Sequence, residues 1–156
     1  MINRTEVTVR KALPSDVNRI FEWRNLDEIV ALSQLQKSVT WEEHLAWFNH
    51  AVSSDAHAMY LIMLQGEEVG LCRFQHEGNL SVLSIYLVSP HHKKGIGSIA
   101  LMACINNEKN KHSIFHAHVR FDNMPSRQFF AKNGFSMINE DGELVTYELR
   151  IAANNS

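Results

Sequence analysis

One segment of this 156-residue chain constrains the fold more than any other, because an apolar strand runs through a basic, glycine-rich loop into an apolar helix. The strand is expected over Leu80–Val88, and the loop contains Lys93, Lys94, Gly95 and Gly97. Backbone N–H groups at a helix N-terminus are unpaired, and the helix dipole there favours negative charge. The glycines let the backbone approach an anion closely, and the lysines add positive charge. The segment predicts a site for a ligand that carries phosphate, although two glycines alone would fit an ordinary surface turn equally well.

Two familiar phosphate-binding motifs do not match this loop. It lacks the GxxxxGK[ST] pattern of nucleotide P-loops and the GxGxxG pattern of dinucleotide-binding folds. The run His92-Lys93-Lys94-Gly95-Ile96-Gly97 instead resembles motif A, [Q/R]xxGx[G/A], of the GNAT superfamily of acetyl-CoA-dependent N-acetyltransferases. Histidine stands at the first position, where the family usually has glutamine or arginine, but the backbone donors of the loop do not depend on that side chain.

A second segment resembles the same family. Residues 123–135 read NMPSRQFFAKNGF, which is similar to the GNAT pattern N-x-x-[A/S]-x-x-[F/L]-Y-x-K-x-G-F. Asn123 suits a helix N-cap, Pro125 suits the first helical turn, and Gly134 can end the helix before a new strand. Either motif alone would be weak, but the two occur in the family's order and at its spacing.

The resemblance covers nearly the whole chain and implies the GNAT fold, of the α/β (α+β) class. This fold has a mixed, mostly antiparallel sheet of about seven strands with about four helices, and its fourth and fifth strands splay apart. We expect a single domain over residues 1–151 and a disordered tail over 152–156. Apolar patterns predict the strands, which are expected over residues 7–12, 59–64, 69–74, 80–88, 114–119, 135–138 and 144–151.

The clearest helix start outside the two motifs is Thr40. With Glu43 it forms a capping box, in which each residue's side chain bonds the backbone of the other. Leu45, Phe48 and Val52 are the expected buried stripe of this helix.

The resemblance implies acetyl-CoA as the acetyl donor, bound between the splayed strands. Its pantetheine arm would pair with the backbone of the fourth strand, and its pyrophosphate would lie on the glycine loop. The expected cofactor-binding residues are Tyr86, Leu87, Val88, His92, Lys93, Lys94, Gly95, Ile96, Gly97 and Ser98, with Asn123, Arg127 and Phe130 from the second motif. The acceptor amine would attack the thioester directly in a ternary complex, without an acyl-enzyme.

The reaction needs an uncharged amine, help for the developing oxyanion and a proton for the departing thiolate. The family commonly supplies that proton from the tyrosine of its second motif, but Phe130 stands at this position and has no proton to give. Water or another residue must then protonate the thiolate, or the chain is a non-catalytic CoA-binding module.

His118 is the expected catalytic base. It lies two residues from His116 in the expected strand, so both point to one face, and many family members have a glutamate where His118 stands. An unperturbed histidine pKa near 6.5 suits proton acceptance at neutral pH. The alternative is that both are packed or solvated strand residues. No metal site is expected, because these histidines and the adjacent His91-His92 pair lack companion ligands at zinc spacing.

Residues 21–25 and 39–48 resemble one particular branch of the GNAT superfamily. They read FEWRN and VTWEEHLAWF, similar to a GNAT branch that contains the pseudaminic-acid-pathway acetyltransferase and other sugar-nucleotide N-acetyltransferases. The expected substrate contacts are Arg24 with a diphosphate, Asn25 with sugar or amide groups, Trp41 with a base or sugar face, and His116. The alternative is that the tryptophans are core anchors, which we favour for Trp47, and that Arg24 is a helix C-terminal charge.

Other acceptors stay open, namely another small amine such as a polyamine or aminoglycoside, or a protein N-terminus. The formal charge of −2 gives no reason to expect nucleic acid. Cys72 and Cys104 lie in apolar stretches, as expected of reduced core thiols in a cytoplasmic protein. We expect no membrane partner, since no apolar run reaches the roughly 18 residues of a spanning helix and no signal peptide opens the chain. A homodimer stays open.

Overall fold

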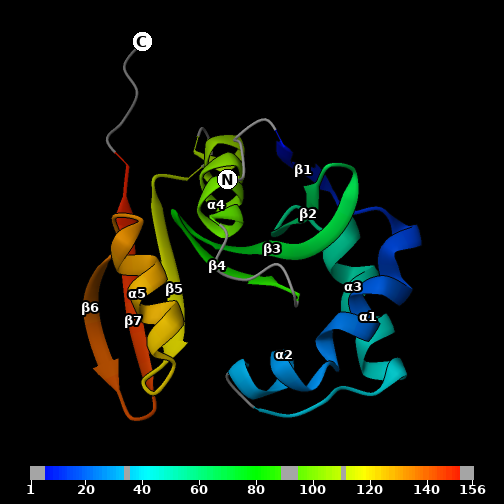
Figure 1. Ribbon diagram of the computed structural model, residues 1–156, viewed down its shortest axis with the longest axis horizontal. Helices are drawn as coiled ribbons and strands as arrows, with labels where there is room; N and C mark the ends of the chain where they lie inside the picture. The colour runs from blue at the N-terminus through cyan, green and yellow to red at the C-terminus, as the bar shows by residue number, and fades with distance from the viewer. Residues whose placement is uncertain (1–5, 34–35, 89–94, 110–111, 152–156) are drawn as a thin grey trace.

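The computed structural model describes residues 6–33, 36–88, 95–109 and 112–151, and Figure 1 shows one mixed sheet with helices on both faces. The strands follow the order β1-β2-β3-β4-β5-β7-β6 across this sheet. They are β1 (Val7–Lys11), β2 (His57–Leu64), β3 (Glu67–Glu77), β4 (Leu80–Leu87), β5 (Ile114–Arg120), β6 (Ser136–Asp141) and β7 (Leu144–Arg150). Neighbouring strands are antiparallel except β4 and β5, which run parallel. The predicted seven-stranded, mostly antiparallel sheet is confirmed.

The described part of the chain contains five α-helices, where about four were expected. They are α1 (Val17–Arg24), α2 (Asp27–Leu32), α3 (Trp41–Ser53), α4 (Ile96–Glu108) and α5 (Met124–Lys132), and the 3-10 turn Pro14–Asp16 leads into α1. The addition is α2, whose six residues form little more than one turn and a half. So short a helix leaves almost no periodic pattern in the sequence.

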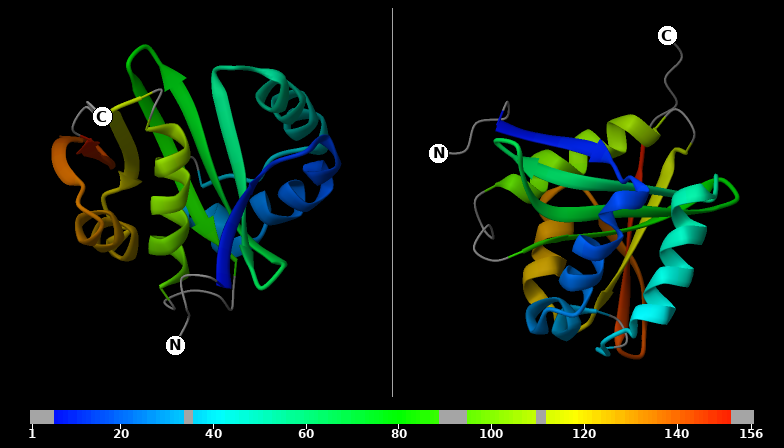
Figure 2. Two further views of the ribbon diagram at one scale, coloured as in Figure 1. Left: turned by 90° about the horizontal axis from the view of Figure 1, so that it is seen from above. Right: turned by 90° about the vertical axis from the view of Figure 1, so that its right-hand side faces the viewer.

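Helices cover both faces of the sheet (Figure 2), and the buried apolar residues form two clusters. Helices α4 and α5 cover one face, where Leu101 and Phe115 are fully buried. Helices α1 and α3 cover the other face, where Ile20 and Phe48 are fully buried. Successive side chains of a strand point to opposite faces, so each central strand contributes to both cores.

The capping box at the start of α3 is confirmed. Thr40 Oγ1 accepts from the Glu43 backbone N–H at 3.1 Å, and the Thr40 N–H donates to Glu43 Oε1 at 3.0 Å. The predicted stripe is wrong in part, because His44, Phe48 and Ala51 are the buried residues of α3. Leu45 and Val52 are only partly buried. A histidine with hydrogen bonds at both ring nitrogens can occupy a core position, which the apolar pattern does not anticipate.

The strands β4 and β5 splay apart, and the candidate active site lies where they separate. The two strands pair only over Leu80–Val82 with Ile114–His116, and beyond Val82 the ladder between them ends. An opening therefore forms in the middle of the sheet, and α4 follows β4 on one side of it (Figure 1).

Candidate active site

A cleft of about 400 Å³ lies at the splay between β4 and β5. Leu83 to Tyr86 line it from β4, and Ala117 to Val119 line it from β5. The rest of the wall comes from α1, α2, the segment between α2 and α3, α3, β3, and α5 with its N-cap residue. Of the predicted site residues, Arg24, Tyr86, His118, Asn123 and Phe130 line this cleft together.

The lining of the cleft is strongly cationic. Arg24, Lys37 and Arg73 line it, and its described lining residues include no aspartate or glutamate. The guanidinium groups of Arg24 and Arg73 lie over the ring of Trp47, at 4.5 Å and 5.3 Å from its centroid. Burial lowers the pKa of both arginines, and the Arg24 charge lowers the pKa of Arg73 further. These two neighbouring cations repel each other, so the cleft favours an anionic group.

His44 holds Arg24 in this position. Its Nδ1 lies 3.1 Å from Arg24 Nη1 and its Nε2 lies 2.8 Å from the Val17 carbonyl oxygen. A guanidinium only donates and a carbonyl only accepts, so Nδ1 must be the acceptor and Nε2 must carry the proton. Burial lowers the pKa of His44, and the Arg24 charge lowers it further. His44 is therefore a neutral histidine in a single tautomer.

Tyr86 brings a buried hydroxyl to the same cleft. Its ring packs edge-on against Trp23, with 6.3 Å between ring centroids. The phenol oxygen is buried and has no hydrogen-bond partner among the residues that the structure describes. Burial raises the pKa of Tyr86, so the hydroxyl keeps its proton and is available as a donor.

His118 and His116 have different surroundings, although both lie on one face of β5. His118 lines the cleft, and its Nδ1 lies 2.9 Å from Thr146 Oγ1 on β7. Burial lowers the pKa of His118, and His116 lowers it further, so the ring is neutral at pH 7. His116 does not line the cleft, and its Nε2 lies 2.9 Å from Glu148 Oε2.

The α5 residues of the second motif divide between the cleft and the scaffold. Asn123 caps α5 by accepting from the Ser126 N–H at 3.3 Å, as predicted, and it also lines the cleft. Phe130 lines the cleft and stacks on Tyr147 with 6.2 Å between ring centroids. Arg127 lies outside the lining, and its Nε donates to the Tyr147 hydroxyl at 3.2 Å.

The glycine loop ends at the N-terminus of α4. Gly95 is the N-cap residue with φ of +79°, a left-handed conformation that glycine adopts without strain. Gly97 packs against α5, because a Cβ there would lie 3.1 Å from Phe129 Cε1. Ser98 Oγ accepts from Asn133 Nδ2 at 3.1 Å. The predicted contacts of His92, Lys93 and Lys94 lie outside the described residues.

Two predicted substrate contacts have structural roles in this chain. The Asn25 side chain donates to the Val39 carbonyl at 3.0 Å and accepts from the Val39 N–H at 2.8 Å, which fixes the segment before α3. Trp41 is partly exposed at the start of α3 and packs edge-on against Phe21, with 5.2 Å between centroids. Neither lines the cleft, so their contact with a substrate stays a prediction.

Sequence reasoning missed Arg73 and His44. Arg73 is the one charged residue in the apolar run that was expected to form a strand over 69–74, and a lone charge in such a run is a signal for a functional or paired group. His44 lies within the segment VTWEEHLAWF, but the sequence pattern indicated no role for it. Trp47, expected to be a core anchor, packs against the core of α1 and α3 and also lines the cleft.

The described residues contain no group of three or more histidine, cysteine, aspartate or glutamate residues placed to hold a metal ion. Cys72 and Cys104 are buried and unbridged, as expected of core thiols. Within the described ranges, no helix is long and apolar enough to cross a membrane.

Residues 6–136 match the model of the Acetyltransferase (GNAT) domain family. No curated protein sequence matches the chain. Among solved structures, the chain is similar to RimL, a ribosomal L7/L12 alpha-N-protein acetyltransferase in complex with coenzyme A, with a TM-score of 0.83, 19% identity, and 96% and 97% of the two chains covered.

Two further likenesses concern other acceptors. The AAC(6')-Ib complex with paromomycin and acetyl-CoA has a TM-score of 0.80 and 17% identity, with 94% of each chain covered. The Campylobacter jejuni N-acetyltransferase PseH has a TM-score of 0.67 and 18% identity, with 93% of this chain and 98% of that chain covered. At such identities the likenesses establish the fold alone. With the family match over most of its length and the splayed β4–β5 cleft, the chain belongs to the GNAT acetyltransferase family.

Proposed function

We propose that this enzyme transfers acetyl from acetyl-CoA to the primary amine of a negatively charged acceptor, and that the acceptor is a nucleotide-linked amino-deoxysugar. The observation that carries the proposal is the Arg24–Arg73 pair over Trp47, in a cleft whose described lining includes no carboxylate. A guanidinium group can donate two parallel hydrogen bonds to the oxygens of one phosphate, and the face of the Trp47 indole suits stacking with a sugar or a base. A diphosphate would neutralise two cations that otherwise repel each other.

The donor side fits acetyl-CoA. The edge of β4 from Leu83 to Tyr86 has no β5 partner in the ladder, so it can pair with the pantetheine amides. The N-terminus of α4 supplies backbone N–H groups, and Gly95 adds no side chain that would cap them. Leu87, Val88, Ile96, Gly97 and Ser98 complete the proposed donor site, and RimL and AAC(6')-Ib are similar structures that contain coenzyme A or acetyl-CoA.

The acceptor amine would attack the thioester carbonyl carbon and form a tetrahedral intermediate. Its proton would pass to His118 Nε2, directly or through water, which requires that Nδ1 carries a proton and donates to Thr146. The carbon–sulfur bond then breaks and the electron pair leaves on the CoA sulfur. Tyr86 can donate its unpartnered hydroxyl to the developing oxyanion.

Phe130 still supplies no proton for the thiolate, so water or another group of the cleft must do so. Phe130 nevertheless lines the cleft. A non-catalytic CoA-binding module is the alternative that this substitution favours.

Two other acceptor classes are distinguishable by charge. A polycationic acceptor, such as an aminoglycoside, is disfavoured because it would place amines beside Arg24 and Arg73. An acidic peptide N-terminus is a second candidate, because its carboxylates would meet the same guanidinium pair, and RimL, a similar structure, is a protein N-acetyltransferase.

The decisive assay is CoA thiol release with a panel of UDP-linked amino sugars, free amino sugars, polyamines and acidic N-terminal peptides. Turnover that requires the nucleotide diphosphate would support the proposal. Faster turnover of polyamines than of any sugar nucleotide would contradict it, and no turnover of any amine would favour the non-catalytic module.

Arg24→Ala sharpens this assay. It should raise the KM for the sugar nucleotide and leave the KM for acetyl-CoA nearly unchanged, since only the acceptor loses a contact. The same variant should have less effect on a free amino sugar, which has no diphosphate to lose. Equal effects on both acceptors would contradict the diphosphate contact.

A further inference from the structure

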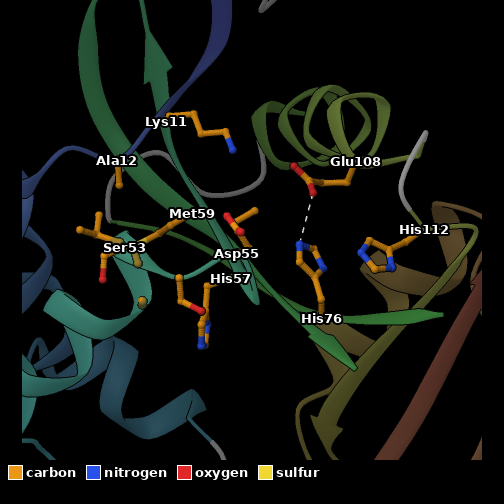
Figure 3. A pocket seen from close by; sticks show the side chains of 13 residues that line it. Lys11, Ala12, Ser53, Asp55, His57, Met59, His76, Glu108 and His112 are labelled. Carbon is orange, nitrogen blue, oxygen red and sulfur yellow. Dashed lines mark ion pairs between the residues drawn. The ribbon is translucent and has the colours of Figure 1, made fainter. Parts of the chain in front are cut away.

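A second cavity, of about 550 Å³, lies beside the C-terminal end of α4 (Figure 3). No residue that lines it also lines the β4–β5 cleft. Its wall is formed by the end of α3 and the following turn, the end of β1, the start of β2, His76 of β3, Glu108 of α4, and His112. Since α4 has 13 residues, this cavity and the glycine loop are separated by about 20 Å along the helix.

Glu108 is the group in this wall that needs a partner. It is 1% exposed, and one carboxylate oxygen, Oε2, accepts from the Tyr60 hydroxyl. The other oxygen, Oε1, accepts no hydrogen bond from any described residue. Glu108 also lies in the last turn of α4, which contains no basic residue. A buried carboxylate at a helix C-terminus is destabilised by the helix dipole, so a cation beside it is strongly favoured.

The neighbouring histidines satisfy this need only in part. His76 Nε2 lies 3.5 Å from Glu108 Oε1, which is an ion pair only when His76 is protonated. The His76 ring stacks on His112, with 4.1 Å between centroids and 17° between planes. His112 Nδ1 is also buried and has no hydrogen-bond partner among the described residues, so it is a second polar atom of this wall without one.

The rest of the wall suits a short aliphatic cation. Ala12, Ala51, Val52 and Met59 contribute apolar surface to the lining, and Asp55 adds a second carboxylate. Lys11 is the one lysine or arginine in the described lining, and its ammonium already lies 5.4 Å from the Tyr60 ring centroid.

We propose that this cavity is a binding site, separate from the acetyl-transfer cleft, for a small aliphatic molecule with a primary ammonium group. The ammonium donates to Glu108 Oε1 and His112 Nδ1, and the alkyl chain lies along the apolar wall.

Calorimetric titration with butylamine at neutral pH tests this site, with butanol as the neutral molecule of the same shape. Butylamine should bind and butanol should bind at least tenfold more weakly, since charge-assisted hydrogen bonds are about twice as strong as neutral ones. Glu108→Gln keeps the side-chain shape and should weaken butylamine binding by about tenfold or more, whereas Glu140→Gln, an exposed carboxylate outside the cavity, should leave it unchanged.

Ser53→Phe provides an independent variant that does not touch the buried carboxylate. Ser53 is exposed and lines the cavity, so a phenyl group there should block the ligand and leave acetyl transfer unchanged. This variant also separates the cavity from the cleft, where an amine can bind as an acceptor. Equal binding of butanol, butylamine binding that survives Ser53→Phe, or tighter binding of Zn²⁺ alone that Glu108→Gln abolishes would each overturn the proposal.

Discussion

Gly70→Ala is the substitution whose effect the structure determines most sharply. A Cβ at Gly70 would lie 2.4 Å from the Tyr86 carbonyl oxygen, 2.9 Å from Leu87 Cδ2 and 3.1 Å from Leu87 Cα. The closest of these atoms belongs to the backbone of β4, which pairs with β3 at this point, so no side-chain rotation can relieve the contact. The strand itself must shift.

The expected change in the free energy of unfolding follows from two destabilising effects and one that opposes them. Overpacking costs about 1–3 kcal/mol, a weakened ladder hydrogen bond costs about 0.5–1.5 kcal/mol, and the lower entropy of the unfolded chain returns about 0.4–1 kcal/mol. Because the contact is with backbone, we expect a loss in the upper part of this range, about 2–4 kcal/mol in the free energy of unfolding. CoA affinity should also fall, since the displaced Tyr86 carbonyl lies on the strand proposed to bind pantetheine.

Urea unfolding and CoA calorimetry measure the two effects. Gly78→Ala is the matched control, because no atom lies within 4 Å of a Cβ there and only its φ of +64° adds strain, of about 1 kcal/mol. If Gly70→Ala were no less stable than Gly78→Ala and bound CoA normally, the close approach of β3 and β4 at Gly70 would be refuted.

Four further changes test the chemistry and its electrostatics. Arg73→Met should raise the KM for a sugar nucleotide about tenfold with no change in the KM for acetyl-CoA, and steady-state kinetics in which both KM values rise equally would contradict the assigned contact. His118→Ala should lower kcat/KM by about 10² or more. In the wild type, the acidic limb of the plot of kcat/KM against pH should lie below pH 6.5, because burial lowers the pKa of His118, and this limb should be absent in the variant. Phe130→Tyr should leave kcat equal or higher, whereas a large loss would indicate that Phe130 packs against a substrate. The pKa of His44 is lowered in the folded state, so its contribution to stability is present above the unfolded-state pKa and is lost as pH falls. The melting temperature of the wild type should therefore decrease as the pH is lowered from 6.5, and the decrease should be smaller in His44→Gln.

The helix boundaries around the proposed donor site could be predicted from the sequence because they are local. The start of α4 after Gly95, the cap at Asn123 and the break at Gly134 each depend on residues a few positions apart, and the structure has these boundaries as expected. The splay between β4 and β5 came from the family resemblance and is confirmed by the short ladder.

The acceptor half depends on contacts between distant segments. Arg73 of β3 and Arg24 of α1 meet over Trp47 of α3, and no periodic pattern in the chain encodes that meeting. The same reason explains the cavity beside Glu108, where Tyr60 lies 48 residues away in sequence. Apolar patterns identify which residues become buried, but they do not identify which buried polar groups meet.

Fold and the proposed acceptor recognition are coupled through His44. The neutral ring accepts from Arg24 and donates to the Val17 carbonyl, so one side chain joins α3 to both ends of α1. Protonation would place an N–H against the guanidinium and convert a hydrogen bond into a repulsion between two cations. Arg24 would then lose the contact that holds it over Trp47, and α1 would lose a bond to α3 in the same step. Acid should therefore weaken acceptor binding and the fold over the same pH range, because both depend on a single unprotonated nitrogen.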